Sequence, residues 1–255
     1  LAPAAEPAAR AALAGVPARR RRRVVLGGAA MLVLALWGAE QYWPLRHAGA
    51  DYLTHTGEIR EITLADGTHV HLDTRSAIDV SMDGARRLIT LRAGEILVES
   101  GHADSRPLEI ATPDGTLRPL GTRFIARAGQ GGTLLLVLQA RVAAQPGRGG
   151  HGAVLGAGQQ VLVESARLGP VTAATPNADA WATGRLVVQD ARLGDVVDTL
   201  RGYRPGLLEL APELADVRVS GTFPLADTDL ALAAIAQSHG LTLSMRTPLW
   251  ASLQR

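Results

Sequence analysis

The feature that most constrains this chain is a run of five arginines directly before an uncharged stretch at residues 24–39: Arg19, Arg20, Arg21, Arg22 and Arg23. Arginine-rich flanks of an apolar segment stay on the cytoplasmic side of a bilayer. The pattern therefore predicts a disordered basic cytoplasmic tail over residues 1–23 and a single transmembrane helix over residues 24–43. The bulk of the chain would lie in the periplasm of a Gram-negative bacterium, anchored in the inner membrane.

The apolar stretch is short for a membrane span. Its helix would measure roughly 24 Å, against a hydrocarbon core of about 30 Å. Trp37, Tyr42 and Trp43 follow it, as an aromatic belt at the outer interface would, and extend the span. A cleaved export signal is the alternative, because Ala48-Gly49-Ala50 offers a small-residue cleavage site. We favour a retained anchor over cleavage.

Composition narrows the functional classes. The chain has 0 Cys, so no disulfide framework, thiolate metal site or thiol nucleophile is available. The sequence pI of about 9.6 comes from the N-terminal arginines. From Asp51 onward the chain holds 19 Arg against 22 Asp and Glu, a net charge of −3. The chain from Asp51 onward therefore lacks the excess positive charge of a nucleic-acid-binding surface, and no nucleic acid is expected as a partner.

Residues 51–165 show short apolar runs of period two, separated by turn signals such as Asp66-Gly67 and Asp83-Gly84. This spacing predicts an all-β domain, solenoid- or sandwich-like, and the sequence does not choose between the architectures, a barrel included. Residues 134–138 are continuously apolar, which predicts a strand buried on both faces. Gly129 to Gly132 is expected to be a hairpin tip.

Residues 166–180 carry Gly169, Pro170 and Pro176 and are expected to form a linker. In residues 181–255 the spacing of the apolar residues changes. The new pattern predicts a β-α-β-β-α-β module with both helices on one sheet face. The first helix is expected to begin at an Asp190 cap, with Leu193, Val196, Val197 and Leu200 on its buried face. Asp227 or Thr228 would cap the second, which stops at Gly240. The fold class is thus mostly β with a C-terminal α+β module.

Several short motifs in the β region resemble the FecR family of membrane-anchored sigma-factor regulators. The motifs are Gly57-Glu58-Ile59-Arg60, Leu64-Ala65-Asp66-Gly67-Thr68, Leu72-Asp73-Thr74, Arg92-Ala93-Gly94-Glu95 and Leu120-Gly121-Thr122-Arg123-Phe124. Residues 181–184, Leu193 to Val197, Tyr203 and Val219-Ser220-Gly221-Thr222-Phe223 resemble the small domain that follows in this family. That domain is similar to the short N-terminal (STN) signalling domains of secretins and TonB-dependent transporters. The sequence departs from the family at Gln139-Ala140-Arg141, where an apolar strand usually ends in Glu-Gly.

The resemblance implies an anti-sigma factor that works by protein–protein contact. Its partners would be the signalling domain of an outer-membrane TonB-dependent transporter and an extracytoplasmic-function sigma factor that controls iron or siderophore uptake genes. The chain begins at Leu1 rather than Met, and we expect sigma-factor binding only if a cytoplasmic segment precedes it. The expected structural or partner-binding motif residues are Asp66, Gly67, Leu72, Gly94, Gly121, Thr122, Arg123 and Phe124. Exposed strand edges pair readily, so candidates for the transporter contact or its support are Val219, Gly221, Phe223, Leu225, Leu241, Thr242 and Leu243.

No catalytic constellation, cofactor motif or metal-ligand set is recognisable. His69 and His71 share one strand face without a third ligand and are expected to be ordinary exposed histidines. Asp227 and Asp229 are explained by helix capping. Arg123 is expected to pair with a carboxylate beside an inward Phe124. We expect no enzyme. The alternatives are a structural component of an envelope secretion or transport machine and, less favoured, a carbohydrate-directed envelope enzyme.

Overall fold

The computed structural model describes residues 49–84, 86–101, 104 and 106–255. The predicted cytoplasmic tail, the arginine run and the predicted span over residues 24–43 lie outside this range. Within it, no helix is both long and apolar enough to cross a membrane. Contacts place Pro44–Arg255 in one compact unit.

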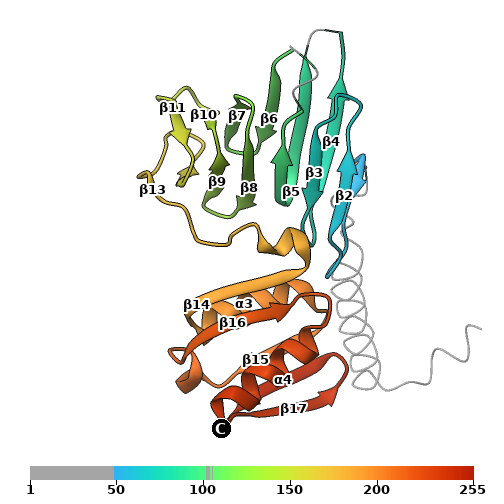
Figure 1. Cartoon of the computed structure of the whole chain (residues 1–255), viewed down its shortest axis with the longest axis vertical. Coiled ribbons are helices and arrows are strands. Elements are labelled where there is room, and N and C mark those ends of the chain that lie inside the picture. The colour runs from blue at the N-terminus through green and yellow to red at the C-terminus, as the bar shows by residue number, and fades with distance from the viewer. Residues whose placement is uncertain (1–48, 85, 102–103, 105) are drawn as a thin grey trace, which may run out of the picture. The chain divides into compact units, whose positions relative to one another are not determined.

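The first part of this unit, which we call the β module, consists of one 13-stranded sheet (Figure 1). Its strands are β1 (Tyr52–Leu53), β2 (Arg60–Thr63), β3 (His69–Leu72), β4 (Ala77–Met82), β5 (Arg87–Glu99), β6 (Leu108–Thr112), β7 (Gly115–Pro119), β8 (Arg123–Gly129), β9 (Gly132–Gln139), β10 (Arg141–Pro146), β11 (Ala153–Gly156), β12 (Gln159–Val163) and β13 (Thr172–Ala173). Neighbours run mostly antiparallel, as the alternating pattern predicted, but β5 and β6 pair in parallel.

The long strand β5 belongs to two layers of this sheet. Its first half pairs with β4 and β6, and its second half pairs with β3 and β8. Side chains from both layers meet in one hydrophobic core, which includes Leu72, Ile89, Ile110, Phe124 and Val137. The architecture is therefore two curled layers around a shared interior, joined by a strand that passes from one layer to the other.

Gly94 makes that passage feasible. It has φ +82°, a conformation that side chains other than glycine rarely adopt. A Cβ atom there would lie 2.5 Å from the Ser76 Cα and 2.8 Å from the Arg75 carbonyl oxygen. The glycine in the Arg92-Ala93-Gly94-Glu95 motif is thus required by the bend and by the close approach of the neighbouring chain.

The second part, which we call the C-terminal module, contains two helices and two small sheets (Figure 1). Its elements are η2 (Ala180–Thr183), β14 (Arg185–Arg192), α3 (Leu193–Tyr203), β15 (Leu207–Leu210), η3 (Pro212–Leu214), β16 (Arg218–Pro224), α4 (Thr228–His239), β17 (Thr242–Thr247) and β18 (Trp250–Gln254). β14 pairs with β16, whereas β15, β18 and β17 form the second sheet in that order.

Three expectations for this module are wrong. The helices do not share one sheet face: each contacts strands of both sheets, so the helical layer lies between them. A final strand, β18, follows β17 and was not predicted. Asp190 does not cap α3, because β14 continues to Arg192 through a bulge at residues 189–190 and pairs with β16 beyond it. Strand pairing there overrides the capping preference of an aspartate.

The helix pattern itself is confirmed. Leu193, Val196, Val197 and Leu200 are all buried, as their spacing predicted. The Asp227 side chain accepts a hydrogen bond from the Leu230 backbone N–H at 2.9 Å, and Gly240 ends α4 at φ +62°. The expected linker, residues 166–180, includes β13, which pairs with β12.

Candidate functional site

The β module and the C-terminal module share a second hydrophobic cluster. Leu97, Ile125 and Leu136 project from β5, β8 and β9 on the side opposite the first core, and each is at most 2% exposed. They belong to one hydrophobic cluster with Trp181 and the buried faces of α3 and α4. The prediction that the apolar strand at residues 134–138 is buried on both faces is therefore confirmed, and its second face belongs to the module junction.

Polar contacts also cross this junction. The Tyr203 hydroxyl on α3 donates to Asp73 Oδ1 at 2.6 Å, and both side chains are buried. The Thr74 hydroxyl donates to the Gly202 carbonyl at 3.0 Å and accepts from the Gly57 backbone N–H at 2.8 Å. These contacts join the segment after β3 to the end of α3.

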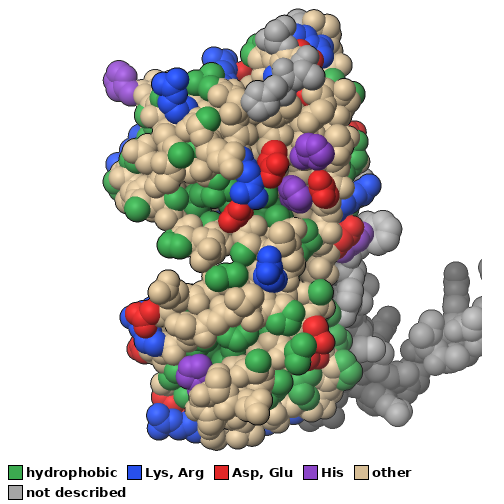
Figure 2. Space-filling view, viewed as in Figure 1, with side chains coloured by type: hydrophobic (Ala, Val, Ile, Leu, Met, Phe, Trp, Pro, Cys, Tyr) green, Lys and Arg blue, Asp and Glu red, His purple; other side chains and the backbone are tan. Residues whose placement is uncertain are grey.

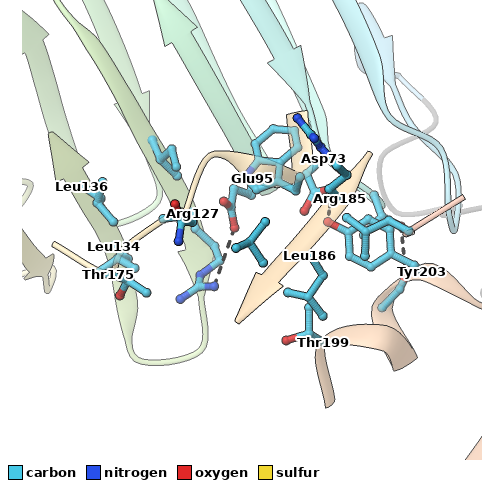
Figure 3. A pocket seen from close by; sticks show the side chains of 18 of the residues that line it. Asp73, Glu95, Arg127, Leu134, Leu136, Thr175, Arg185, Leu186, Thr199 and Tyr203 are labelled. Carbon is cyan, nitrogen blue, oxygen red and sulfur yellow. Dashed lines mark hydrogen bonds and ion pairs between the residues drawn. The ribbon is translucent and has the colours of Figure 1, made fainter. Parts of the chain in front are cut away.

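A cleft of about 610 Å³ opens beside these contacts and is lined by both modules. Figure 3 shows its polar centre, where Glu95 from β5 and Arg127 from β8 point toward each other next to Leu186 of β14. Leu134, Leu136 and Leu186 supply apolar walls. The volume lies in the range of ligand sites, and a mainly apolar lining with a few polar groups is typical of them.

Two carboxyl groups in this cleft, those of Asp73 and Glu95, have unusual acidities. Burial raises the pKa of Asp73 to about 6, although the hydrogen bonds from Tyr203 and the Thr74 backbone oppose the rise. Burial also raises the pKa of Glu95 to about 7, and the nearby Asp73 charge adds to this effect. Arg127 and the Trp181 indole act in the opposite direction. Arg127 is too distant to compensate fully, since its Nη1 lies 3.7 Å from the Glu95 Oε2.

Burial also raises the pKa of the Tyr203 phenol, and the charge of the adjacent Asp73 adds to this rise. Tyr203 therefore acts as a neutral hydrogen-bond donor. Perturbed carboxyl groups in a cleft indicate a functional site in general. Sequence reasoning did not single out Asp73, Glu95, Arg127 or Tyr203, although Asp73, Glu95 and Tyr203 stand within the quoted segments.

Of the expected motif residues, Gly94 lines the cleft, and the others lie elsewhere in the β module. Asp66 is buried and pairs with Arg87 Nη1 at 2.7 Å, and Gly67 takes φ +80° in the turn. Leu72 and Phe124 are fully buried in the first core. As expected, Arg123 pairs with carboxylates, Glu99 at 2.6 Å and Asp179 at 2.5 Å.

A second, polar hollow lies beside the Gly121-Thr122-Arg123 segment. It is lined by residues that include His69, Glu99 and Ser100. Figure 2 shows histidine, acidic and arginine side chains side by side on this face of the β module. His69 and His71 lie 3.3 and 4.0 Å from the Glu61 carboxylate. Among the described residues there is no group of three or more potential metal ligands.

The residues proposed for the transporter contact differ in how deeply they are buried. Val219, Phe223 and Leu225 are buried in the second cluster and can only support a contact surface. Gly221, Leu241 and Leu243 are half-buried, whereas Thr242 is exposed on β17. β17 is an edge strand of its sheet, which leaves one side without a partner strand among the described residues.

The turn after β9 contains the departure from the family pattern. Its Ala140 takes φ +54°, a left-handed conformation. The turn is therefore strained, because L residues with a Cβ disfavour this region.

Known proteins resemble this chain in fold and, over part of its length, in sequence. The chain matches no curated protein sequence. Two crystal structures of a candidate anti-sigma factor from Parabacteroides distasonis ATCC 8503, at 1.65 and 2.50 Å resolution, are similar in fold. Both have a TM-score of 0.63 and 20% sequence identity to this chain. The similar region covers 80% of this chain, 98% of the chain in the 1.65 Å structure and 97% of the chain in the 2.50 Å structure. Residues 50–143 match the model of the FecR protein family, and this match supports a FecR-family domain in the β module.

Proposed function

We propose that the chain is a regulator of an extracytoplasmic-function sigma factor that transmits a signal from the periplasm to the cytoplasm. The observation that carries the proposal is the FecR match over residues 50–143, in a module whose strands β5, β8 and β9 share a hydrophobic cluster with a second domain. The fold similarity to a candidate anti-sigma factor supports the same role. The chain works in this proposal by binding other proteins and is not an enzyme.

The signal would come from the signalling domain of an outer-membrane TonB-dependent transporter, and the regulated genes would serve iron or siderophore uptake. The test compares the transcriptome of a strain that lacks the gene with that of its parent strain, under iron limitation. We expect one sigma-dependent promoter class, including a transporter gene, to differ between the two strains. Identical transcriptomes would reject this role.

The proposed topology places residues 1–23 in the cytoplasm, a single inner-membrane span at residues 24–43 and the remainder in the periplasm. Alkaline phosphatase fused after Arg255 should be active, because this enzyme needs an oxidising compartment. β-Galactosidase fused at the same position should be inactive. The reverse pattern would overturn the topology, and release of a soluble fragment that begins near Asp51 would favour signal cleavage.

The transporter contact is proposed at the exposed edge of β17, because an open strand edge can pair with a partner strand. Thr242→Asp should weaken binding of a candidate signalling domain, measured by calorimetry. The melting temperature should move by no more than about 2 °C, as is usual for surface changes. Val154→Asp charges the edge strand β11 of the β module at another exposed position and is the matched control. Equal losses in both variants would argue against a β17 contact.

A further inference from the structure

The cleft between the modules is bordered by a free strand edge. Among the described residues, β14 pairs only with β16, in a two-stranded sheet. Leu186, Val187 and Val188 all line the cleft. Successive side chains of a strand point to opposite faces, so a cavity that touches three residues in succession touches the edge of the strand as well as one of its faces.

The register identifies the backbone groups on that edge. The Leu225 N–H donates to the Gly184 carbonyl at 2.9 Å, so these two residues form a hydrogen-bonded pair of the antiparallel ladder. Such pairs alternate along the ladder, so Leu186 and Val188 direct their N–H and C=O groups toward β16. The N–H and C=O of Val187, between them, point away from β16, and no strand among the described residues pairs with them.

The Glu95 charge is incompletely balanced. Glu95 and Asp73 face the cleft from the β module, whereas Asp198, which faces it from α3, is paired with Arg201. The opposing cations are Arg127, whose side chain is 58% exposed, and Arg185 at the start of β14. A buried carboxylate with only a distant, solvated partner favours a second cation.

We propose that this cleft binds an extended peptide segment of a partner protein that carries a basic side chain. The peptide backbone pairs with β14 at Val187, and the basic side chain reaches Glu95. Apolar side chains of the peptide lie against Leu134 and Leu186. This surface is separate from the β17 edge and does not depend on the identity of the transporter or sigma factor.

The test uses synthetic pentapeptides and the full chain in detergent micelles. The probe is acetyl-Thr-Val-Lys-Val-Thr-amide, and its analogues carry leucine or glutamate in place of lysine. Affinity is measured by fluorescence anisotropy of labelled peptide. At pH 8 we expect the lysine peptide to bind at least about tenfold more tightly than either analogue, because charge-assisted contacts are the stronger ones. The lysine preference should shrink as the pH falls from 8 to 6, since Glu95 becomes protonated near pH 7.

Strand addition has its own signature. N-methylation of alternate amides in the lysine peptide should abolish binding for one alternating set and leave the other set bound, because only every second residue faces β14. Hydrogen exchange in residues 185–189 should slow when the peptide binds, because the Val187 N–H then gains a partner.

The protein variants separate charge from folding. Glu95→Gln should remove the preference for lysine while the leucine peptide binds as before. Glu109→Gln, which alters an exposed pair with Arg118 on β6, should leave the preference intact. Equal affinity for all three peptides, tolerance of both N-methylation patterns, or equal competition by acetyl-lysine-methylamide would overturn the proposal. The last result would show an amine site rather than a peptide site.

Discussion

Replacing Glu95 by glutamine should change how stability depends on pH. The Glu95 side chain is 13% exposed, and its pKa is raised from 4.5 to about 7, first by burial and then by the neighbouring Asp73. A raised carboxyl pKa means that the folded state binds the proton more tightly than the unfolded state. The stabilisation that protonated Glu95 gives the folded state is therefore fully present below pH 4.5, and it is lost as the pH rises through about 7.

The magnitude follows from the pKa values. One pKa unit corresponds to about 1.4 kcal/mol, so ionising Glu95 costs up to about 3 kcal/mol of unfolding free energy by pH 8. Glutamine has nearly the same shape and does not ionise. It loses the pair with Arg127, which contributes little because that side chain is mostly exposed. Glu95→Gln should thus match the wild type within about 1 kcal/mol at pH 5 and exceed it by about 2–3 kcal/mol at pH 8.

The assay is urea unfolding of residues 44–255 at four pH values between 5 and 8, followed by circular dichroism and tryptophan fluorescence. Glu109→Gln is the control, since its carboxylate pairs with Arg118 at the surface. The wild-type and control curves should fall together toward pH 8, and the Glu95→Gln curve should be flatter. Parallel curves for all three proteins would show that Glu95 titrates normally, and the account of the cleft electrostatics would be wrong.

Three further changes test other parts of the structure. Gly94→Ala should cost about 3 kcal/mol or more in chemical denaturation, because its φ is positive and a Cβ would strike Ser76. Serine at position 94 should be no better tolerated. Ala140→Gly should raise the unfolding free energy by about 0.5–1 kcal/mol, because glycine relieves the left-handed strain but loses more chain entropy; no gain would mean that the turn is unstrained. Tyr203→Phe should cost about 1–3 kcal/mol, since Asp73 loses its donor. This loss should grow between pH 5 and 8, because the hydrogen bond holds the Asp73 pKa down, and a constant loss would contradict that role.

Much of the secondary structure could be predicted because local patterns and tertiary contacts agree. The alternation of apolar residues marked most strands of the β module, and the spacing from Leu193 to Leu200 marked the buried face of α3. Asp227 and Gly240 marked the two ends of α4. In each case the side chain that gives the local signal also makes the contact that fixes the element.

The errors arise where pairing partners far apart in sequence decide the outcome. Asp190 looks like a helix cap locally, but its segment is held in β14 by pairing with β16. β18 was missed because its inward residues, Ala251 and Leu253, are few and one is small. The division into two sheets could not be predicted because it depends on which strand edges meet.

The candidate site was missed for a related reason. Asp73 and Glu95 stand at the end of β3 and within β5, and in the sequence they look like ordinary polar positions of half-exposed strands. Their burial comes from the C-terminal module, which covers that side of the sheet about 130 residues later, as the 2.6 Å contact with Tyr203 shows. A polar residue between apolar neighbours gives no local signal of such coverage.

Apolar burial and carboxylate ionisation have opposite effects on the stability of the junction between the two modules. Leu97, Ile125 and Leu136 are fully buried there, and such burial contributes about 1.5–3 kcal/mol for each side chain. Ionised Asp73 and Glu95 each cost about 3 kcal/mol at neutral pH, from their raised pKa values. The ionised carboxylates therefore oppose the apolar contacts of the same junction. A cation bound beside Glu95 would offset part of their cost. A partner that supplies such a cation would thus change the electrostatic balance between the modules.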